Sequence, residues 1–140
     1  MIEGTFRNPD STEFAYIFHM KNYPGLVKIG IAWDLNHRSD EEYGELFNFI
    51  ELPRLDAWLI EQATLHSTRS LWDCPDELLE KKWVGSTEVR KMKAEIAFKI
   101  LEFYHDELEA CGRTIFAAEF LPVTPKQKEK LIEATSAISQ

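Results

Sequence analysis

Two apolar runs and the turn between them decide the fold: residues 14–31 read FAYIFHMKNYPGLVKIGI. Residues 14–18 and 26–31 are rich in aromatic and β-branched side chains, which are typical of strands. Between the runs, residues 22–25 (NYPG) supply the residue types that turns favour. The stretch therefore predicts a β-hairpin.

The sequence after the hairpin predicts a short helix, a third strand and a second helix. Asp34 can cap a helix over residues 35–42, because its carboxylate accepts free amide hydrogens of a first turn. The apolar residues of 46–52 indicate a strand buried on both faces. Pro53 suits the first turn of a helix whose apolar face runs to His66.

The C-terminal half predicts one long helix among shorter elements. We expect a loop over 70–82 with at most a short helical turn at 76–80, followed by a small extended piece at 83–85. A long helix is then predicted from Ser86 or Thr87 to about Ala110. A strand over 114–121 and a polar helix after Pro125 complete the prediction. Gly112 is the predicted stop of the long helix.

The length of 140 residues fits one domain. Residues 1–12 are predicted as a loose N-terminal segment, residues 13–111 as the main body, and residues 112–140 as a strand-helix extension of the same domain. The sequence leaves the oligomeric state open.

Charge and cysteine content narrow the classes of function. The formal net charge is −8, which disfavours long-range attraction to nucleic acid but permits a local basic groove or a carboxylate that clamps a metal ion. The two cysteines, Cys74 and Cys111, lie outside any CxxC or Cys/His cluster, so we expect neither a disulfide framework nor a zinc site. No apolar run approaches a membrane span, and we expect a soluble, cytoplasmic protein without a membrane partner.

Five polar side chains come from successive predicted elements and form the candidate site. They are Tyr16, Lys28, His37, Arg38 and Glu61. Phosphodiester hydrolysis uses these residue types, because a carboxylate-bound metal polarises the phosphate, an arginine stabilises negative charge, and a phenol or amine handles the proton of the nucleophile.

Each candidate also has an ordinary structural explanation. A tyrosine in a strand commonly packs across to its neighbours, and a lysine or a helix-borne arginine commonly faces solvent. Glu61 either lies buried with a partner or sits exposed at the edge of its helix face. His37 and His66 are accessory candidates that could equally be structural.

Basic residues gather locally at one place in the chain. They are Lys81, Lys82, Arg90, Lys91 and Lys93. This cluster is the candidate DNA-facing surface, with a plain solvated face as the alternative. The four tryptophans, Trp33, Trp58, Trp72 and Trp83, are expected to pack rather than to stack on bases, since no basic stretch interleaves with them.

The hairpin residues resemble a nuclease motif. Phe14-Ala15-Tyr16 and Lys28-Ile29-Gly30, separated by eleven residues, resemble the paired tripeptides of the GIY-YIG nuclease superfamily. The stretch 24–30, PGLVKIG, is similar to the phage- and bacterial-type branch related to the meiotically up-regulated gene group, in which lysine replaces the first tyrosine of YIG.

Later segments extend this resemblance over about residues 13–100. Residues 34–38 resemble the helix start that carries the family's arginine. Residues 57–66, with Glu61, are similar to the helix whose glutamate binds the metal, and residues 83–89 resemble the Gly- and Glu-containing segment that starts the last core helix.

The resemblance implies an α/β fold of the α+β type: a small three-stranded, mainly antiparallel sheet flanked by helices. It implies a hydrolase, a divalent-metal-dependent endonuclease acting on DNA with Mg²⁺ or Mn²⁺. Tyr16 would position or deprotonate the nucleophile, Lys28 would replace the second tyrosine, Arg38 would bind the scissile phosphate, and Glu61 would hold the metal.

Two departures keep other functions open. Phe14 and Ala15 replace the usual glycine and isoleucine, and Trp33 stands where a small hydroxyl residue is common. Residues 13–66 also carry nine acidic against four basic side chains. One alternative is a catalytically weak or inactive domain that binds a protein, encoded by a phage and acting in the host cytoplasm. Another is the nuclease module of an assembly whose DNA-binding part lies elsewhere.

Overall fold

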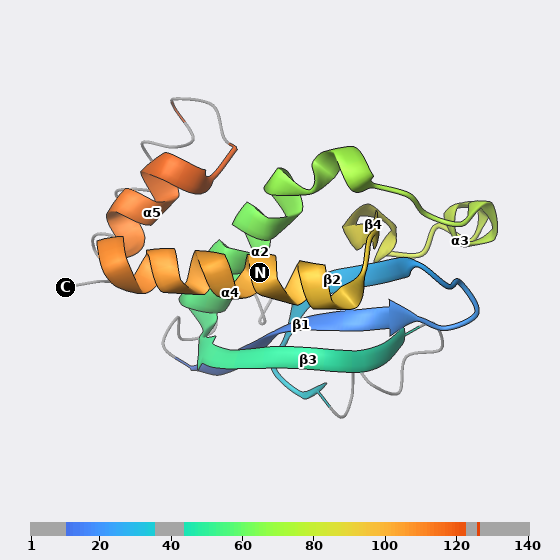
Figure 1. Cartoon of the computed structure of the whole chain (residues 1–140), viewed down its shortest axis with the longest axis horizontal. Coiled ribbons are helices and arrows are strands. Elements are labelled where there is room, and N and C mark those ends of the chain that lie inside the picture. Colours follow the sequence, from blue (N-terminus) through green and yellow to red (C-terminus); the bar gives the residue numbers. More distant parts are fainter. Residues whose placement is uncertain (1–10, 36–43, 123–125, 127–140) are drawn as a thin grey trace, which may run out of the picture.

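A four-stranded antiparallel sheet organises the chain (Figure 1). The structure is a computed structural model, and it describes residues 11–35, 44–122 and 126. The strands are β1 (Thr12–Met20), β2 (Leu26–Ala32), β3 (Gly44–Pro53) and β4 (Val89–Lys91), in the spatial order β3-β1-β2-β4. The strands predicted over residues 14–18, 26–31 and 46–52 are confirmed, and β4 is an additional strand. A mixed α/β architecture with an antiparallel sheet is thus confirmed.

The predicted hairpin forms β1 and β2. The two strands pair with Tyr16 opposite Gly30 and Phe18 opposite Lys28. In the turn between them Gly25 has φ 89°, a left-handed conformation that glycine adopts without steric cost. The register places the two residues predicted to act together, Tyr16 and Lys28, two positions apart along the ladder.

Helices cover one face of the sheet (Figure 1). They are α2 (Arg54–Ser67), α4 (Ala94–Cys111) and α5 (Arg113–Phe120), with a short α3 (Asp76–Glu80) and two 3₁₀ turns, Arg69–Leu71 and Ser86–Glu88, in the connection between α2 and β4. Alternating strand residues such as Ala15, Ile17 and Ile29 pack against α2 and α4 and form the main core.

The opposite face of the hairpin carries a smaller cluster. Tyr16, Phe18 and Ala32 are buried there, and Leu46 and Leu35 pack against them. Because successive strand residues point to opposite faces, Tyr16 and Lys28 belong to this second face. The candidate residues therefore lie off the main core.

The long helix starts later than the sequence predicts. Residues 83–85, predicted as extended, form a turn, and α4 begins at Ala94 rather than at residue 86 or 87. Residues 89–91 instead form β4, which pairs with residues 26–28 of β2. In the sequence Val89 lies at helical spacing from the apolar residues that follow it. Pairing with the edge of β2 nevertheless buries the Val89 side chain completely, so long-range packing overrides the local pattern. Gly112, with φ 85°, ends α4 as predicted.

The strand predicted over residues 114–121 is also wrong. This segment is helix α5, whose buried Phe116 and Ala117 face the core. The ring of Phe116 contacts Tyr104 of α4 at a centroid distance of 6.1 Å, and Phe120 contacts the same ring at 5.5 Å. The aromatic residues that suggest a strand thus serve helical packing at a spacing of four residues.

Two predicted helices, over residues 35–42 and after Pro125, lie almost entirely outside the described residues. Within the described part of the chain, no helix is both long and apolar enough to cross a bilayer.

Candidate functional site

A polar pocket of about 220 Å³ opens beyond the end of β4, where β2, α2 and the turn at residues 83–88 meet. We call it the polar pocket. Its lining residues are Tyr16, Lys28, Ile31, Glu61, Trp83, Val84, Gly85 and Glu88. Three of the five candidate residues from the sequence are therefore brought together here.

Tyr16 and Lys28 form the floor of the polar pocket. Lys28 Nζ donates a hydrogen bond to Tyr16 Oη at 2.5 Å, and the two residues are only 4% and 1% exposed. Gly30 makes this arrangement possible, because a Cβ at that position would lie 2.6 Å from Cζ of the Tyr16 ring. The ring of Tyr16 therefore packs directly over Gly30 of β2, which has no side chain.

The ammonium of Lys28 is enclosed by aromatic rings and one carboxylate. Its Nζ lies 5.1 Å from the ring centroid of Tyr16 and 5.9 Å from that of Trp83, within range of cation–π attraction. Glu88 Oε1 lies 3.6 Å from the same nitrogen. These contacts compensate the desolvation of a buried positive charge.

Glu61 contributes a buried carboxylate from α2. Its side chain is 4% exposed, and Gln62 Nε2 donates a hydrogen bond to its Oε1 at 2.9 Å. Burial, reinforced by the negative charge of Glu88, raises the pKa of Glu61 to about 7, against smaller opposing effects of Gln62 and Lys28. Near neutral pH this carboxyl group therefore exchanges between its protonated and ionised forms.

The turn at residues 83–88 is held in place by neighbours on both sides. Trp72 Nε1 donates to the carbonyl oxygen of Ser86 at 2.8 Å, and Arg90 Nη1 donates to that of Thr87 at 2.8 Å. At Gly85 a Cβ would lie 2.6 Å from the Trp83 ring and 2.9 Å from Cε of Lys28, so the turn packs closely on the lysine.

Glu88 is a site residue that the sequence analysis did not single out. It lines the polar pocket from the end of the turn, with a side chain that is 27% exposed. Glu88 belongs to the segment 83–89, which resembles a family segment that contains Gly and Glu. Because the sequence predicts a long helix from residue 86, it does not place Glu88 beside Lys28.

Arg90 does not belong to the exposed basic cluster. It is 4% exposed, its Nε donates to Thr68 Oγ1 at 3.0 Å, and its Nη2 donates to the carbonyl oxygen of Leu65 at 3.0 Å. Burial lowers the pKa of its guanidinium, and the charge of Glu88 acts in the opposite direction. Arg90 thus ties the end of α2 to β4. The four lysines of the cluster, Lys81, Lys82, Lys91 and Lys93, are exposed.

One accessory candidate, His66, lies outside the polar pocket. Arg38 and His37 lie outside the described residues. His66 sits in the last turn of α2, with Nε2 3.3 Å from Arg69 Nη1, and it does not line the polar pocket. Its pKa is lowered, first by desolvation and then by the charge of Arg69.

Two of the tryptophans depart from the expected packing role. Trp33 and Trp72 are 60% and 47% exposed, whereas Trp58 packs against the main core and Trp83 lines the polar pocket. The segment after β2 thus presents an indole to solvent.

Glu61 is the buried carboxylate of the polar pocket that could take part in holding a divalent cation. Mg²⁺ is commonly held by one or two carboxylates and several waters, and two carboxylates, Glu61 and Glu88, line this pocket. Glu61 is the buried member, whose negative charge is disfavoured by its surroundings and would be compensated by a cation. In the described part of the chain, no group of three or more His, Cys, Asp or Glu side chains could hold a metal ion.

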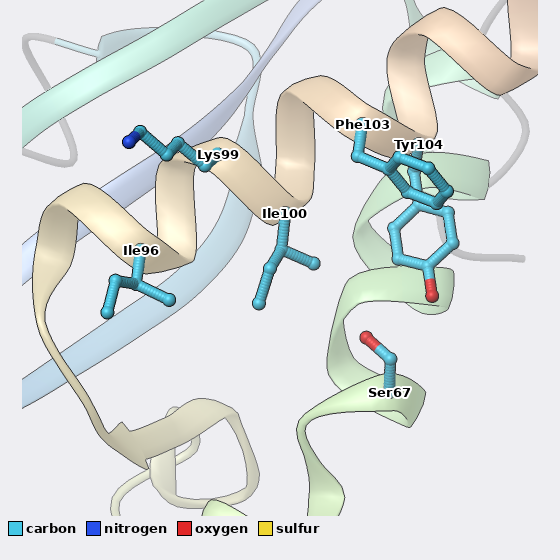
Figure 2. A pocket seen from close by; sticks show the side chains of 6 residues that line it. All are labelled: Ser67, Ile96, Lys99, Ile100, Phe103 and Tyr104. Atoms are coloured by element: carbon cyan, nitrogen blue, oxygen red, sulfur yellow. The ribbon is translucent and has the colours of Figure 1, made fainter.

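A second cavity lies between α2 and α4, and we call it the apolar groove. It encloses about 360 Å³ and is lined by Ser67, Ile96, Lys99, Ile100, Phe103 and Tyr104 (Figure 2). Figure 2 shows the amine of Lys99 directed away from the apolar side chains. No candidate residue from the sequence lies in this groove.

Comparisons of the chain with models of protein families, with curated proteins and with solved structures found no match.

Proposed function

We propose that this protein is a divalent-metal-dependent endonuclease of the GIY-YIG type, hydrolysing phosphodiester bonds in DNA. One observation carries the proposal: Tyr16, Lys28 and Glu61, which are far apart in sequence and come from three elements, line the same pocket. The resemblance assigns these three positions to catalysis and metal binding.

Tyr16 and Lys28 suit the handling of a proton. In hydrolysis a water oxygen attacks phosphorus and loses a proton, and the bond to one bridging oxygen breaks with its electron pair on that oxygen, which takes up a proton from solvent. Tyr16 Oη orients that water or accepts its proton. The ammonium of Lys28, 2.5 Å from Tyr16 Oη, stabilises negative charge on this oxygen.

Glu61 suits the metal role, with Glu88 beside it in the polar pocket. When bound by Glu61, Mg²⁺ or Mn²⁺ would polarise a phosphoryl oxygen of the substrate and offset its negative charge. The cation also reconciles an acidic pocket with an anionic substrate, since Lys28 alone cannot balance two ionised carboxylates. Arg38 takes the phosphate-binding role by resemblance.

The exposed lysines around the polar pocket support a nucleic-acid substrate. Lys81 and Lys82 directly precede Trp83, which lines the pocket. Lysines of this kind bind the phosphate backbone without regard to sequence and make binding depend on salt. Low ionic strength is therefore the condition in which cleavage should first be sought.

Nicking of labelled plasmid and branched DNA, at low salt in Mg²⁺ or Mn²⁺, tests the proposal. We expect metal-dependent cleavage by the wild type and none by Glu61→Gln, with Glu77→Gln on α3 as the matched exposed control. Cleavage that survives Glu61→Gln would overturn the assignment. Absence of cleavage by the wild type would favour the protein-binding alternative, which predicts a tight complex unaffected by Tyr16→Phe.

A further inference from the structure

Glu88 and Tyr16 both contact the ammonium group of Lys28. Lys28 Nζ has Tyr16 Oη at 2.5 Å and Glu88 Oε1 at 3.6 Å. We infer that Glu88 is a positioning residue, which holds the Lys28 ammonium against Tyr16 and so prepares the phenol for its reaction. The inference rests on the proposed function.

The need for such a residue follows from the flexibility of lysine. Its four-carbon stem leaves the ammonium free to rotate among several positions, and no fixed fork orients its donors. Tyr16, Phe18 and Trp83 confine the ammonium by their rings but attract it in no single direction. The carboxylate of Glu88, 3.6 Å from Lys28 Nζ, supplies an opposite charge that attracts the ammonium to one place.

The backbone around Glu88 is built to keep that carboxylate in place. Trp72 and Arg90 donate hydrogen bonds to the carbonyl oxygens of Ser86 and Thr87, the two residues before Glu88. Arg90 itself is buried and bonded to the end of α2, the helix that carries Glu61. The backbone that precedes Glu88 is therefore tied to α2 through Arg90.

Gly85 adds a steric reason for the same arrangement. A Cβ there would lie 2.9 Å from Cε of Lys28, so the lysine stem runs against the backbone of the turn. The turn thus supports the stem of Lys28 through Gly85 and its ammonium through Glu88.

Single-turnover cleavage over a Mg²⁺ titration tests the positioning role. We expect Glu88→Gln to lower the maximal rate about 10- to 100-fold, the range seen for supporting residues around a site, with half-saturating Mg²⁺ unchanged within about twofold. Glu88→Asp should recover part of the rate, and Glu77→Gln should cleave like the wild type. A Glu88→Gln rate equal to that of the wild type, or a loss removed by more Mg²⁺, would overturn the inference.

A second measurement needs no cleavage. Denaturant midpoints are compared for the wild type, Lys28→Met, Glu88→Gln and the double variant, with circular dichroism to confirm that each folds. We expect non-additive midpoint shifts, because Glu88 acts through Lys28; additive shifts would overturn the pairing. If the wild type cuts no DNA, the proposed function fails, while this cycle still decides whether Glu88 holds Lys28.

Discussion

The polar pocket and the apolar groove differ in what their walls are made of. The smaller cavity, at about 220 Å³, gathers an ammonium, a phenol and two carboxylates from segments spread between residues 16 and 88. The larger, at about 360 Å³, is lined mainly by aliphatic and aromatic side chains of α4. The two cavities are therefore distinguished by buried charge and not by volume.

The two cavities also differ in what they cost the fold. Burying Glu61 and Lys28 is unfavourable unless each charge is compensated, whereas the groove leaves Ile96 and Phe103 half in solvent at little energetic consequence. Such a local sacrifice of stability is typical of a functional site. Substitutions in the polar pocket should therefore affect activity, and those in the groove should affect stability only.

Removal of a charge from each cavity should give the largest contrast. We expect Lys28→Met to lower single-turnover DNA cleavage about 100- to 10,000-fold, because the ammonium beside Tyr16 Oη is lost where negative charge develops. Lys99→Met, at the rim of the apolar groove, should leave the rate within about twofold. Equal losses from both substitutions would erase the distinction between the two cavities.

The pH dependence of stability should reveal the buried carboxyl group. The pKa of Glu61 is raised from 4.5 to about 7 in the folded chain, so between these values the unfolded chain releases a proton that the folded chain retains. Stability contributed by this group is present below pH 4.5 and is lost as the pH rises to about 7, amounting to about 3 kcal/mol.

Glu61→Gln isolates this contribution from other titrating groups. The free energy of unfolding of Glu61→Gln, measured by denaturant titration relative to the wild type, should rise by about 3 kcal/mol from pH 4 to pH 8. The same variant is expected to lose cleavage. A constant difference between the two proteins over that range would show that Glu61 titrates normally and is not buried as described.

Much of the fold follows from local sequence, and the exceptions have one physical cause. The hairpin and α2 combine clear periodicity with turn residues, and these elements and β3 were predicted close to their observed bounds. The predicted burial of β3 on both faces was wrong, because most of its residues are half-buried or exposed. The predictions at β4 and α5 were wrong because contacts with distant residues determine the secondary structure there. Residues 89–91 pair with β2, and the rings of Phe116 and Phe120 pack against Tyr104. Such contacts leave little trace in a short window of sequence.

Three residues that line the polar pocket could be named from the sequence, but the contacts that support them could not. Tyr16, Lys28 and Glu61 stand at motif spacing in the sequence, which is why they could be named. Glu88 could not be placed, because its relation to Lys28 depends on the turn that precedes β4. Arg90 has the positive charge expected of a DNA-binding residue. Only the structure shows that it is buried and donates a hydrogen bond to α2.

A methyl group at Gly30 should sharpen the comparison further. Gly30→Ala places a Cβ against the Tyr16 ring, so we expect about 1–3 kcal/mol of destabilisation from overpacking and a displaced Tyr16 Oη. Thermal or denaturant unfolding measures the first effect, and DNA cleavage the second. In a Tyr16→Ala background the same substitution should cost almost nothing, and a persistent cost there would show that the strain lies elsewhere.

The smallest effect is expected in the apolar groove. Phe103 is 52% exposed, so Phe103→Ser should lower the free energy of unfolding by less than about 1 kcal/mol. Leu101→Ala, two residues away and fully buried in the core, should cost about 2–5 kcal/mol. Denaturant unfolding at protein concentrations differing tenfold compares them. If Phe103→Ser costs as much as Leu101→Ala, the groove is covered in solution, and its exposed side chains belong to a packed interface after all.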